Sequence, residues 1–348
     1  MKGACEDVFS FRNNYVGIDL GTSNMLVAIK NKRIVFNEPS IIAIDKKTDE
    51  VIAIGKEAKE MIGKNPSEIE VIQPVKNGVI ADYLATEKLI KAIFKKISKK
   101  YMIKHPRVIV GIPTGITEVE ERALQKVFIQ AGAKEVYLIE EPTAAAIGAN
   151  LQVSEPTGSI IVDIGGGTTE VAVISLNGVV ATTSIKVAGD ILDEAIINYL
   201  KKELNLIIGP STAERVKKEV GTVIISEEEE EQSTKACGRD IKTGLPKTVD
   251  ITSKHIQEAI KEPIHEIIES IKSTLEKAPP EISADLGEKG IYISGGGALI
   301  KNLDKLITYK TEMPVFIAED ALECVVKGAV RISEEMDTWK NVLISVKK

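Results

Sequence analysis

The chain has 348 residues and a formal net charge of −6, with 43% hydrophobic and 28% charged side chains. This length predicts about two globular domains, and the acidic balance does not favour a nucleic-acid partner. Cys5, Cys237 and Cys324 lie too far apart for a metal-binding spacing, and they fit a reducing cytoplasm. No segment approaches the ~20 apolar residues of a membrane-spanning helix, and residues 1–14 lack the apolar core of a signal peptide.

The first predicted element is a strand that ends in a carboxylate and a glycine turn. Residues 16–24 read Val-Gly-Ile-Asp-Leu-Gly-Thr-Ser-Asn, and residues 25–29 resume as an apolar strand. Glycine lets bare backbone N–H groups approach an anion closely. Asp19 is a candidate metal-binding residue, because a charge in a buried strand needs a partner. The candidate phosphate-binding residues are Gly21, Thr22, Ser23 and Asn24.

Three apolar residues lie among lysines in a loop further along the chain. Residues 99–107 read Lys-Lys-Tyr-Met-Ile-Lys-His-Pro-Arg and follow a helix predicted over residues 83–99. One interpretation is a loop that packs against its own domain. The other is a wedge that inserts Tyr101, Met102 and Ile103 into a lipid interface, while the lysines meet anionic headgroups.

A pair of glutamates stands where a strand leads into a helix. The strand predicted over residues 136–139 runs into Glu140 and Glu141, and Pro142 suits the first turn of a helix. Open α/β sheets place their chemistry at the carboxyl ends of their strands. Glu141 is therefore a candidate catalytic residue.

The second half of the chain repeats the pattern of the first. Residues 160–170 read Ile-Ile-Val-Asp-Ile-Gly-Gly-Gly-Thr-Thr-Glu, again a buried strand, a carboxylate, glycines and hydroxyls. Asp163 corresponds to Asp19. This duplication implies two similar domains whose turns face each other across a cleft; two unrelated glycine hairpins are the alternative. The candidate phosphate-binding residues of the second copy are Gly165, Gly166, Gly167 and Thr168.

Two such turns, with a carboxylate in each, fit a nucleoside triphosphate and a divalent cation. Mg²⁺ prefers oxygen ligands and keeps several of its waters, so we expect Asp19 and Asp163 to hold it through water. Glu141 and the Thr168 hydroxyl are the candidates that orient an attacking water toward the γ-phosphorus. The chain has no Gly-x-x-x-x-Gly-Lys-Ser/Thr run, so it is not a P-loop enzyme. A third glycine cluster follows the strand predicted over residues 291–293, and it consists of Gly295, Gly296 and Gly297.

The ordered set of motifs resembles that of the actin, sugar-kinase and heat-shock ATPase superfamily. Within it the chain is similar to MreB, the bacterial actin family, from about residue 16 to residue 331. The superfamily motifs are Asp-Leu-Gly-Thr-Ser-Asn, Glu-Glu-Pro-Thr-Ala-Ala-Ala-Ile-Gly, Asp-Ile-Gly-Gly-Gly-Thr-Thr-Glu, Ala-Gly-Asp and Ser-Gly-Gly-Gly-Ala. The segments particular to the bacterial actins are Asn-Glu-Pro-Ser from Asn37, Gly-Val-Ile-Ala-Asp-Tyr from Gly78, Ala-Glu-Arg-Val-Lys from Ala213 and Thr-Gly-Leu-Pro from Thr243.

This resemblance implies an α/β, actin-like ATPase fold, in which two duplicated ribonuclease-H-like domains surround a nucleotide cleft. The implied first domain is residues 1–155, with a small subdomain at about 43–75, and the C-terminal segment 322–348 returns to it. The implied second domain is residues 156–321, with a small subdomain at about 191–255.

The resemblance also implies ATP and Mg²⁺ as cofactors, with the metal, the attacking water and the phosphates at the residues named above. It adds Glu214 and Lys217 as contacts of the ribose and adenine. It places Gly189, Asp190 and the third glycine cluster close to the nucleotide.

The resemblance further implies a partner and a location. Tyr101, Met102 and Ile103 correspond to the membrane-inserting loop of the family, and the helix over residues 119–131 corresponds to the face that pairs two protofilaments antiparallel. We therefore expect a slow ATP hydrolase that polymerises with itself into double filaments on the inner face of the cell membrane. Its role would lie in cell shape, morphogenesis or motility, with paralogues and morphogenesis proteins as further partners. The residues after Arg331 resemble the family only loosely, so no role is assigned to them.

Two other functions on the same fold stay open. A small-molecule kinase would need a general-base Asp besides the two metal aspartates, and the sequence offers no evident candidate. A heat-shock-type ATPase would need a peptide-binding β domain, which we do not expect after Arg331.

Overall fold

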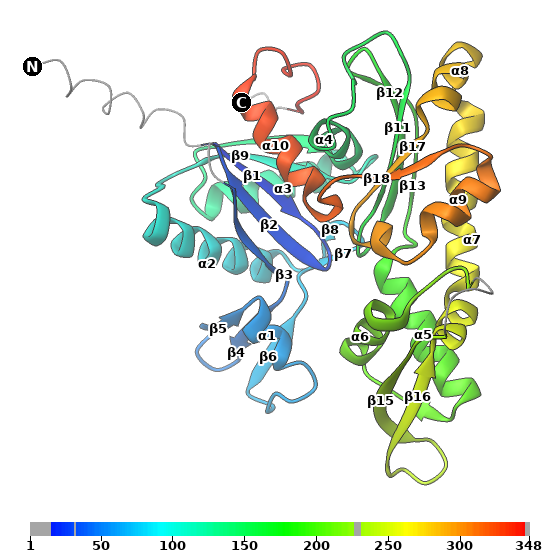
Figure 1. Cartoon of the computed structure of the whole chain (residues 1–348). Coiled ribbons are helices and arrows are strands. Elements are labelled where there is room, and N and C mark those ends of the chain that lie inside the picture. The colour runs from blue at the N-terminus through cyan, green and yellow to red at the C-terminus, as the bar shows by residue number, and fades with distance from the viewer. Residues whose placement is uncertain (1–14, 31–32, 226–230, 345–348) are drawn as a thin grey trace, which may run out of the picture. The chain divides into compact units, whose positions relative to one another are not determined.

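The computed structural model describes residues 15–30, 33–225 and 231–344 (Figure 1). The chain divides into two compact units. Unit 1 consists of the described residues of Met1–Ser154 and of Glu323–Lys348, and unit 2 of those of Glu155–Leu322. The chain therefore leaves unit 1 once and returns to it at Glu323.

Unit 1 is built on a five-stranded sheet in the order β10-β9-β1-β2-β3. β1, β2 and β3 form an antiparallel meander, whereas β1, β9 and β10 run parallel. The central strands β1 and β9 are buried on both faces, which explains their nearly continuous apolar sequences. The strands are β1 Tyr15–Leu20, β2 Asn24–Ile29, β3 Ile34–Pro39, β9 Arg107–Ile112 and β10 Glu135–Glu140.

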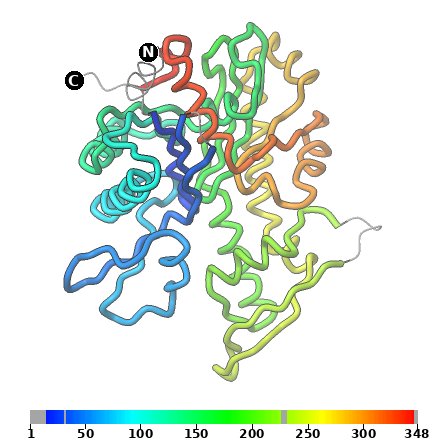
Figure 2. The backbone as a smooth tube through the Cα atoms, turned by 60° about the vertical axis from the view of Figure 1, so that its left-hand side comes forward, coloured from blue at the N-terminus to red at the C-terminus, as the bar shows by residue number. Residues whose placement is uncertain are grey.

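Helices cover both faces of this sheet. On one face, α2 and α3 pack their apolar stripes against the strands, and Leu89, Ile93 and Phe128 are fully buried there. On the other face, α10 lies beside β1 and β2, as Figure 2 shows, and packs against α4. The helices are α2 Tyr83–Tyr101, α3 Glu118–Gln130, α4 Glu141–Gly148 and α10 Cys324–Glu334.

A smaller sheet in the order β5-β4-β6 is inserted after β3 and carries α1. It has a small core of its own, formed by Ile41, Ala43, Ala53 and Ala58. The chain then forms the hairpin of β7 and β8 before it enters α2. The elements are β4 Ile42–Asp45, β5 Val51–Ile54, α1 Lys56–Glu60, β6 Ile69–Ile72, β7 Val75–Lys76 and β8 Val79–Ile80.

Unit 2 repeats the sheet topology of unit 1, with the order β13-β12-β11-β17-β18. β11, β12 and β13 form the antiparallel meander, and β11, β17 and β18 run parallel. The duplicated turn sequences therefore lie at equivalent places, between β1 and β2 and between β11 and β12. The strands are β11 Ser159–Ile164, β12 Thr169–Ser175, β13 Gly178–Ile185, β17 Ile291–Ser294 and β18 Val315–Ile317.

The helices of unit 2 share one core with this sheet. The long helix α7 packs on β12 and β13, and α5 packs against both α7 and α6. A small three-stranded sheet, β14-β15-β16, lies beside α6. The elements are α5 Gly189–Glu203, β14 Leu206–Ile207, α6 Pro210–Val220, β15 Ser233–Asp240, β16 Pro246–Thr252, α7 Ser253–Lys277, α8 Pro280–Lys289 and α9 Leu303–Thr311. Two short 3₁₀ helices are η2 Gly296–Leu299 and η3 Ala321–Glu323, and η3 ends in the first residue of the segment that returns to unit 1.

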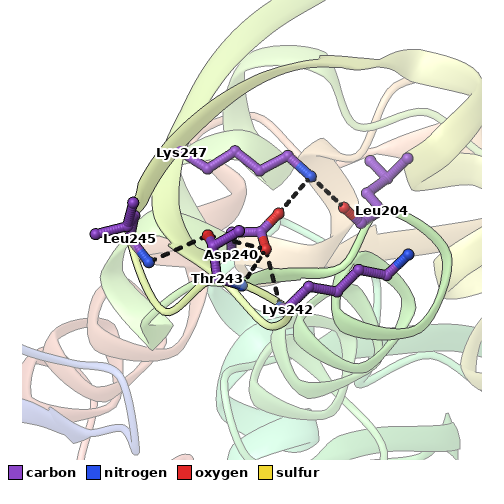
Figure 3. Close-up of polar contacts among 6 residues, drawn as sticks. All are labelled: Leu204, Asp240, Lys242, Thr243, Leu245 and Lys247. Carbon is purple, nitrogen blue, oxygen red and sulfur yellow. Dashed lines mark hydrogen bonds and ion pairs between the residues drawn. The ribbon is translucent and has the colours of Figure 1, made fainter.

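The hairpin of β15 and β16 ends in a well-bonded turn (Figure 3). Asp240 accepts hydrogen bonds from the N–H groups of Lys242 at 2.8 Å and Thr243 at 2.9 Å. Lys247 Nζ lies 3.0 Å from Asp240 Oδ2 and donates to the carbonyl oxygen of Leu204 at 3.0 Å. These donors, led by the Thr243 N–H, lower the pKa of Asp240 to about 2. The turn that carries the Thr-Gly-Leu-Pro segment is thereby tied to the end of α5.

Candidate functional site

The first glycine turn joins β1 to β2 in unit 1. Asp19 lies one residue before the end of β1, in register with Gly111 of β9. Gly21 has no room for a side chain, because a Cβ there would lie 2.7 Å from the carbonyl oxygen of Asn24. The structure thus brings Asp19 and residues 21–24 together at one end of the sheet.

Residues that flank the small sheet hold this turn by its carbonyl groups. The Ser40 hydroxyl donates to the carbonyl oxygen of Gly21 at 2.6 Å, and the Ser40 N–H donates to that of Ser23 at 3.0 Å. The Gln73 side-chain amide donates to the carbonyl oxygen of Thr22 at 3.0 Å. The C=O and N–H of a trans peptide point in opposite directions. Carbonyls that face the protein therefore turn the following N–H groups the other way, as a backbone anion site requires.

Glu141 is the first residue of α4 and is 8% exposed. Gly111 on β9 pairs with Asp19 on β1 and with Ile139 on β10. A Cβ at Gly111 would lie 3.2 Å from Cγ of Glu141. The absence of a side chain at Gly111 therefore lets Glu141 pack closely against the strand that pairs with Asp19.

The second glycine turn, in unit 2, has a more deeply buried carboxylate. Asp163 near the end of β11 is 7% exposed, and the Ser294 hydroxyl of β17 donates to its Oδ1 at 2.6 Å. Its register partner on β12 is the fully buried Glu170, to which the Ser184 hydroxyl donates at 2.6 Å. Burial raises the pKa of Asp163 to about 6; the Ser294 hydrogen bond opposes this rise, and the charge of Glu170 adds to it. A cation beside Asp163 would favour its carboxylate form.

The N-terminus of α5 packs onto this turn. The N–H of Gly165 donates to the carbonyl oxygen of Thr168 at 2.9 Å and closes the turn. The N–H groups of Gly189 and Asp190 donate to the carbonyl oxygens of Gly165 at 3.2 Å and Gly166 at 2.8 Å. Gly189 and Asp190 thus position the turn, and their predicted contact with the nucleotide would have to come from their other atoms.

The third glycine cluster lies against the same turn. Gly295 has a φ of +79°, and a Cβ there would lie 2.3 Å from the carbonyl oxygen of Ile164. A Cβ at Gly297 would lie 2.2 Å from Cγ2 of Ile164. Gly296 between them is exposed. Because Ile164 directly follows Asp163, only glycine at these positions allows the third cluster to approach the carboxylate-bearing turn.

Lys217 ties α6 to α5. Its Nζ donates to the carbonyl oxygen of Gly189 at 2.7 Å and lies 2.9 Å from Oδ1 of Asp193, and the two side chains are 12% and 14% exposed. Burial raises the pKa of Asp193 to about 6, although the charge of Lys217 opposes the rise. Glu214, one turn earlier on α6, pairs with Lys218 at 2.6 Å. The contacts of Glu214 and Lys217 with ribose and adenine stay a prediction.

The apolar loop after α2 is only partly exposed. Met102 caps the C-terminus of α2 with a φ of +60° and is 75% exposed. Ile103 is 8% exposed and belongs to the core of unit 1, against which Tyr101 also packs. Ile103 therefore does not fit the interpretation as a wedge inserted into lipid, because its side chain is buried in the core of unit 1. Of the loop residues, Met102 keeps the exposure that a lipid contact needs. Within the described ranges no helix has the length and apolar character of a membrane span.

The donor set of the two turns fits Mg²⁺. No three His, Cys, Asp or Glu side chains group into a metal site among the residues that the structure describes. Each unit instead offers one carboxylate beside a glycine turn, Asp19 or Asp163. A cation that keeps several waters and takes phosphate oxygens needs only such sparse protein ligands.

Sequence patterns alone do not identify several residues that hold the turns. Ser40 ends the Asn-Glu-Pro-Ser segment, and Gly78 begins the next segment particular to bacterial actins; its N–H donates to the Thr22 hydroxyl at 2.9 Å. For Ser40 and Gly78, the sequence signal was their place in segments that resemble those of the bacterial actins. Glu170 stands opposite Asp163, which the hairpin register could have indicated. Gln73 carried no local signal.

Comparison with known proteins decides the family. The family described as MreB/Mbl protein matches residues 13–341. The chain belongs to the MreB/Mbl family. The cell shape-determining protein MreB of Escherichia coli (strain K12) is 47% identical over 338 residues, which cover 96% of this chain and 97% of that protein.

Solved structures agree with this MreB/Mbl assignment. Crystal structures of MreB5 of Spiroplasma citri, bound to ADP and to AMPPNP, are 39% identical to this chain and have TM-scores of 0.88 and 0.89. They cover 95% of this MreB/Mbl chain, and 99% and 98% of their own. The predicted family and the predicted α/β, actin-like fold are confirmed.

Proposed function

We propose that this chain is a cytoskeletal ATPase that binds ATP with Mg²⁺ and assembles into filaments on the inner face of the cell membrane. The observation that carries the proposal is the convergence of distant segments on one carboxylate-bearing turn. Ser294 binds Asp163 and the third glycine cluster packs against Ile164. The start of α5 binds the carbonyl groups of Gly165 and Gly166. A second turn of the same design follows Asp19 in unit 1. Family membership favours this function over the kinase and heat-shock alternatives.

In the proposed mechanism, the glycine turn of each unit is a phosphate-binding element for ATP. The N–H groups of residues 21–24 and 166–168 would donate to phosphate oxygens, as preorganised backbone dipoles do in other anion sites, whereas the Gly165 N–H closes its own turn. Asp19 and Asp163 would hold Mg²⁺ through its waters, and the cation would neutralise phosphate charge. Glu141 and the Thr168 hydroxyl, both buried, orient one water toward the γ-phosphorus.

Filament assembly is proposed from the family and from an exposed face of this chain. Val119 and Ile129 on α3 are 76% and 48% exposed, although both are apolar. By its resemblance to the family, this helix is expected to form the contact between two antiparallel protofilaments. ATP would favour the subunit conformation that makes contacts, and hydrolysis would weaken them.

Membrane association and a role in cell shape complete the proposal. The exposed Met102 beside Lys99, Lys100 and Lys104 suits a shallow contact with anionic lipid. The relatives described as cell shape-determining proteins support a role in shape rather than in metabolism.

Electron microscopy and sedimentation test the proposal directly. The purified chain is incubated with ATP or ADP, with and without vesicles that contain anionic lipid. We expect double filaments with ATP, bound to vesicles when these are present, and release of phosphate. A chain that stays monomeric with ATP across protein concentration, salt and lipid would contradict the assembly proposal, and absence of ATP binding would contradict the site.

A further inference from the structure

A basic pocket lies in unit 1 between the C-terminal half of α2 and the segments that follow α2 and α3. Its volume is about 290 Å³. It is adjacent to Met102 in sequence and has no part in the proposed nucleotide site. The residues that line it are Val16, Lys91, Phe94, Lys95, Ile97, Ser98, Ile103, Lys104, His105, Pro106, Ala131 and Gly132.

The lining combines an apolar wall with cations. Ile97 and Ile103 are buried, and Phe94 is half-buried, so their side chains form a fixed apolar surface. Lys95 and Lys104 are exposed, and neither forms an ion pair within the described part of the chain. No lining residue is acidic, although the whole chain carries a net charge of −6. The pocket therefore has the charge of a site for an anion.

A third lysine of the lining, Lys91, is neutralised by an ion pair. Lys91 pairs with Glu87, one turn earlier on α2, and Glu87 itself does not line the pocket. Lys95 and Lys104 consequently supply the uncompensated positive charge. A free phosphate would use these two cations but would leave the apolar wall without a function.

We propose that this pocket binds the headgroup of one anionic phospholipid, with the phosphate at Lys95 and Lys104 and the first acyl carbons against Ile97 and Ile103. The pocket lies near the lower limit of the ~300–1,000 Å³ typical of small-molecule sites. It has room for a headgroup and a few carbons rather than for two whole acyl chains.

The inference rests on the proposed membrane association and gives it a chemical selectivity. Met102 contacts lipid without regard to the headgroup, whereas the pocket discriminates by charge. It also gives Ile103 a function, since this residue is buried in the wall of the pocket rather than inserted in the bilayer.

Short-chain lipids test the pocket without a membrane. The full chain, carrying ¹³C-labelled isoleucine methyl groups, is titrated below the critical micelle concentration with dihexanoyl phosphatidylglycerol. Dihexanoyl phosphatidylcholine, inorganic phosphate and glycerol 3-phosphate are titrated in parallel. We expect the phosphatidylglycerol to shift the methyl signals of Ile97 and Ile103 while leaving Ile161 of unit 2 unchanged. The other three probes should bind at least tenfold more weakly.

Matched charge variants separate the pocket from general electrostatics. Each lysine near an anionic surface contributes about a fivefold gain in binding. Lys95→Gln with Lys104→Gln should therefore weaken phosphatidylglycerol binding roughly 30-fold. Lys99→Gln with Lys100→Gln removes the same charge from exposed residues outside the lining and should weaken it less than threefold.

The outcomes distinguish this inference from the membrane proposal. Equal binding of phosphatidylglycerol and phosphatidylcholine, or equal losses in the two double variants, overturns the pocket. Binding of inorganic phosphate as tight as that of phosphatidylglycerol overturns the lipid assignment. If the wild-type chain binds the soluble lipid but not vesicles, the membrane proposal fails and the pocket stands. If it binds vesicles but not the soluble lipid, the pocket proposal fails and the membrane proposal stands.

Discussion

The hydroxyl of Ser294 donates a hydrogen bond to Oδ1 of Asp163 at 2.6 Å, and both residues are buried. Ser294 ends β17 and Asp163 lies near the end of β11, so the bond joins two parallel neighbours at their carboxyl edge. It fixes the orientation of the carboxylate that is proposed to hold the waters of Mg²⁺. The residue that follows Ser294 begins the third glycine cluster, so one short segment both orients Asp163 and packs against its turn.

Replacing Ser294 by Ala should weaken Mg²⁺-dependent nucleotide binding by about 10- to 100-fold, the range seen when partners of metal-binding residues are removed. The measurement is the affinity for a fluorescent ATP analogue as a function of Mg²⁺ concentration. Nucleotide binding in EDTA should change little, because the variant keeps the glycine turns. An affinity loss of the same size in EDTA would show that Ser294 supports the fold rather than the cation.

Replacing Glu141 by Ala should slow ATP turnover by roughly 10²-fold or more while leaving ATP binding nearly intact. Glu141 is buried and packs closely against Gly111, and it is proposed to orient the attacking water. Phosphate release and ATP affinity are measured on the same preparation. The matched control is Glu140→Ala, at the residue that ends β10, and this variant should retain turnover. Unchanged turnover in Glu141→Ala would mean that another group orients the water.

Asp193 should make the stability of unit 2 depend on pH. Its pKa in the folded protein is raised to about 6 from 3.8, mainly by burial, with opposition from Lys217 and small contributions from Glu214 and Asp190. The folded state therefore binds a proton more tightly than the unfolded state. The contribution of protonated Asp193 is fully present below about pH 4 and is lost as the pH rises through about 6.

The test compares the free energy of unfolding of the wild-type chain with that of Asp193→Asn between pH 4 and pH 7. The wild-type value should fall relative to the variant by up to about 3 kcal/mol, since one pKa unit corresponds to about 1.4 kcal/mol. A difference that stays constant, or that grows in favour of the wild type with rising pH, would show that the Lys217 pair outweighs burial.

Gly328→Ala should destabilise unit 1 by about 3 kcal/mol or more. A Cβ at this position of α10 would lie 1.9 Å from the carbonyl oxygen of Ala144 on α4, so the two helices would have to separate. Gly287→Ala on α8 is the matched control, because a Cβ there meets nothing within 4 Å. It should be neutral or stabilising by up to ~1 kcal/mol. Calorimetric melting of both variants gives the answer, and equal melting temperatures would contradict the close packing of α4 and α10.

Val119→Glu should separate protofilaments without blocking polymerisation. The side chain is 76% exposed on α3, so the subunit tolerates the charge, but two like charges would meet at an antiparallel contact. Electron microscopy with ATP should show single rather than double filaments. Glu118→Gln, at the neighbouring exposed position, serves as control and should keep the double form. Double filaments in Val119→Glu would place the contact on another face.

The sequence by itself determined the duplicated turn design. Each copy consists of an apolar strand, an aspartate, glycines and hydroxyls, and these are local requirements of backbone geometry and burial. The sequence also predicted Glu141 as a candidate, because a strand that runs directly into a helix places its last residues at the edge of the sheet.

Tertiary structure alone decided how those turns are held and what lies beside them. Gln73 and Ser40 come from the two ends of an inserted sheet, and no local pattern indicates that both bind the first turn. Ile103 looked exposed between lysines, yet the end of α2 folds it back into the core and creates the basic pocket. Such features depend on which distant segments pack together, and packing is set by the free energy of the whole core rather than by the preference of any one segment.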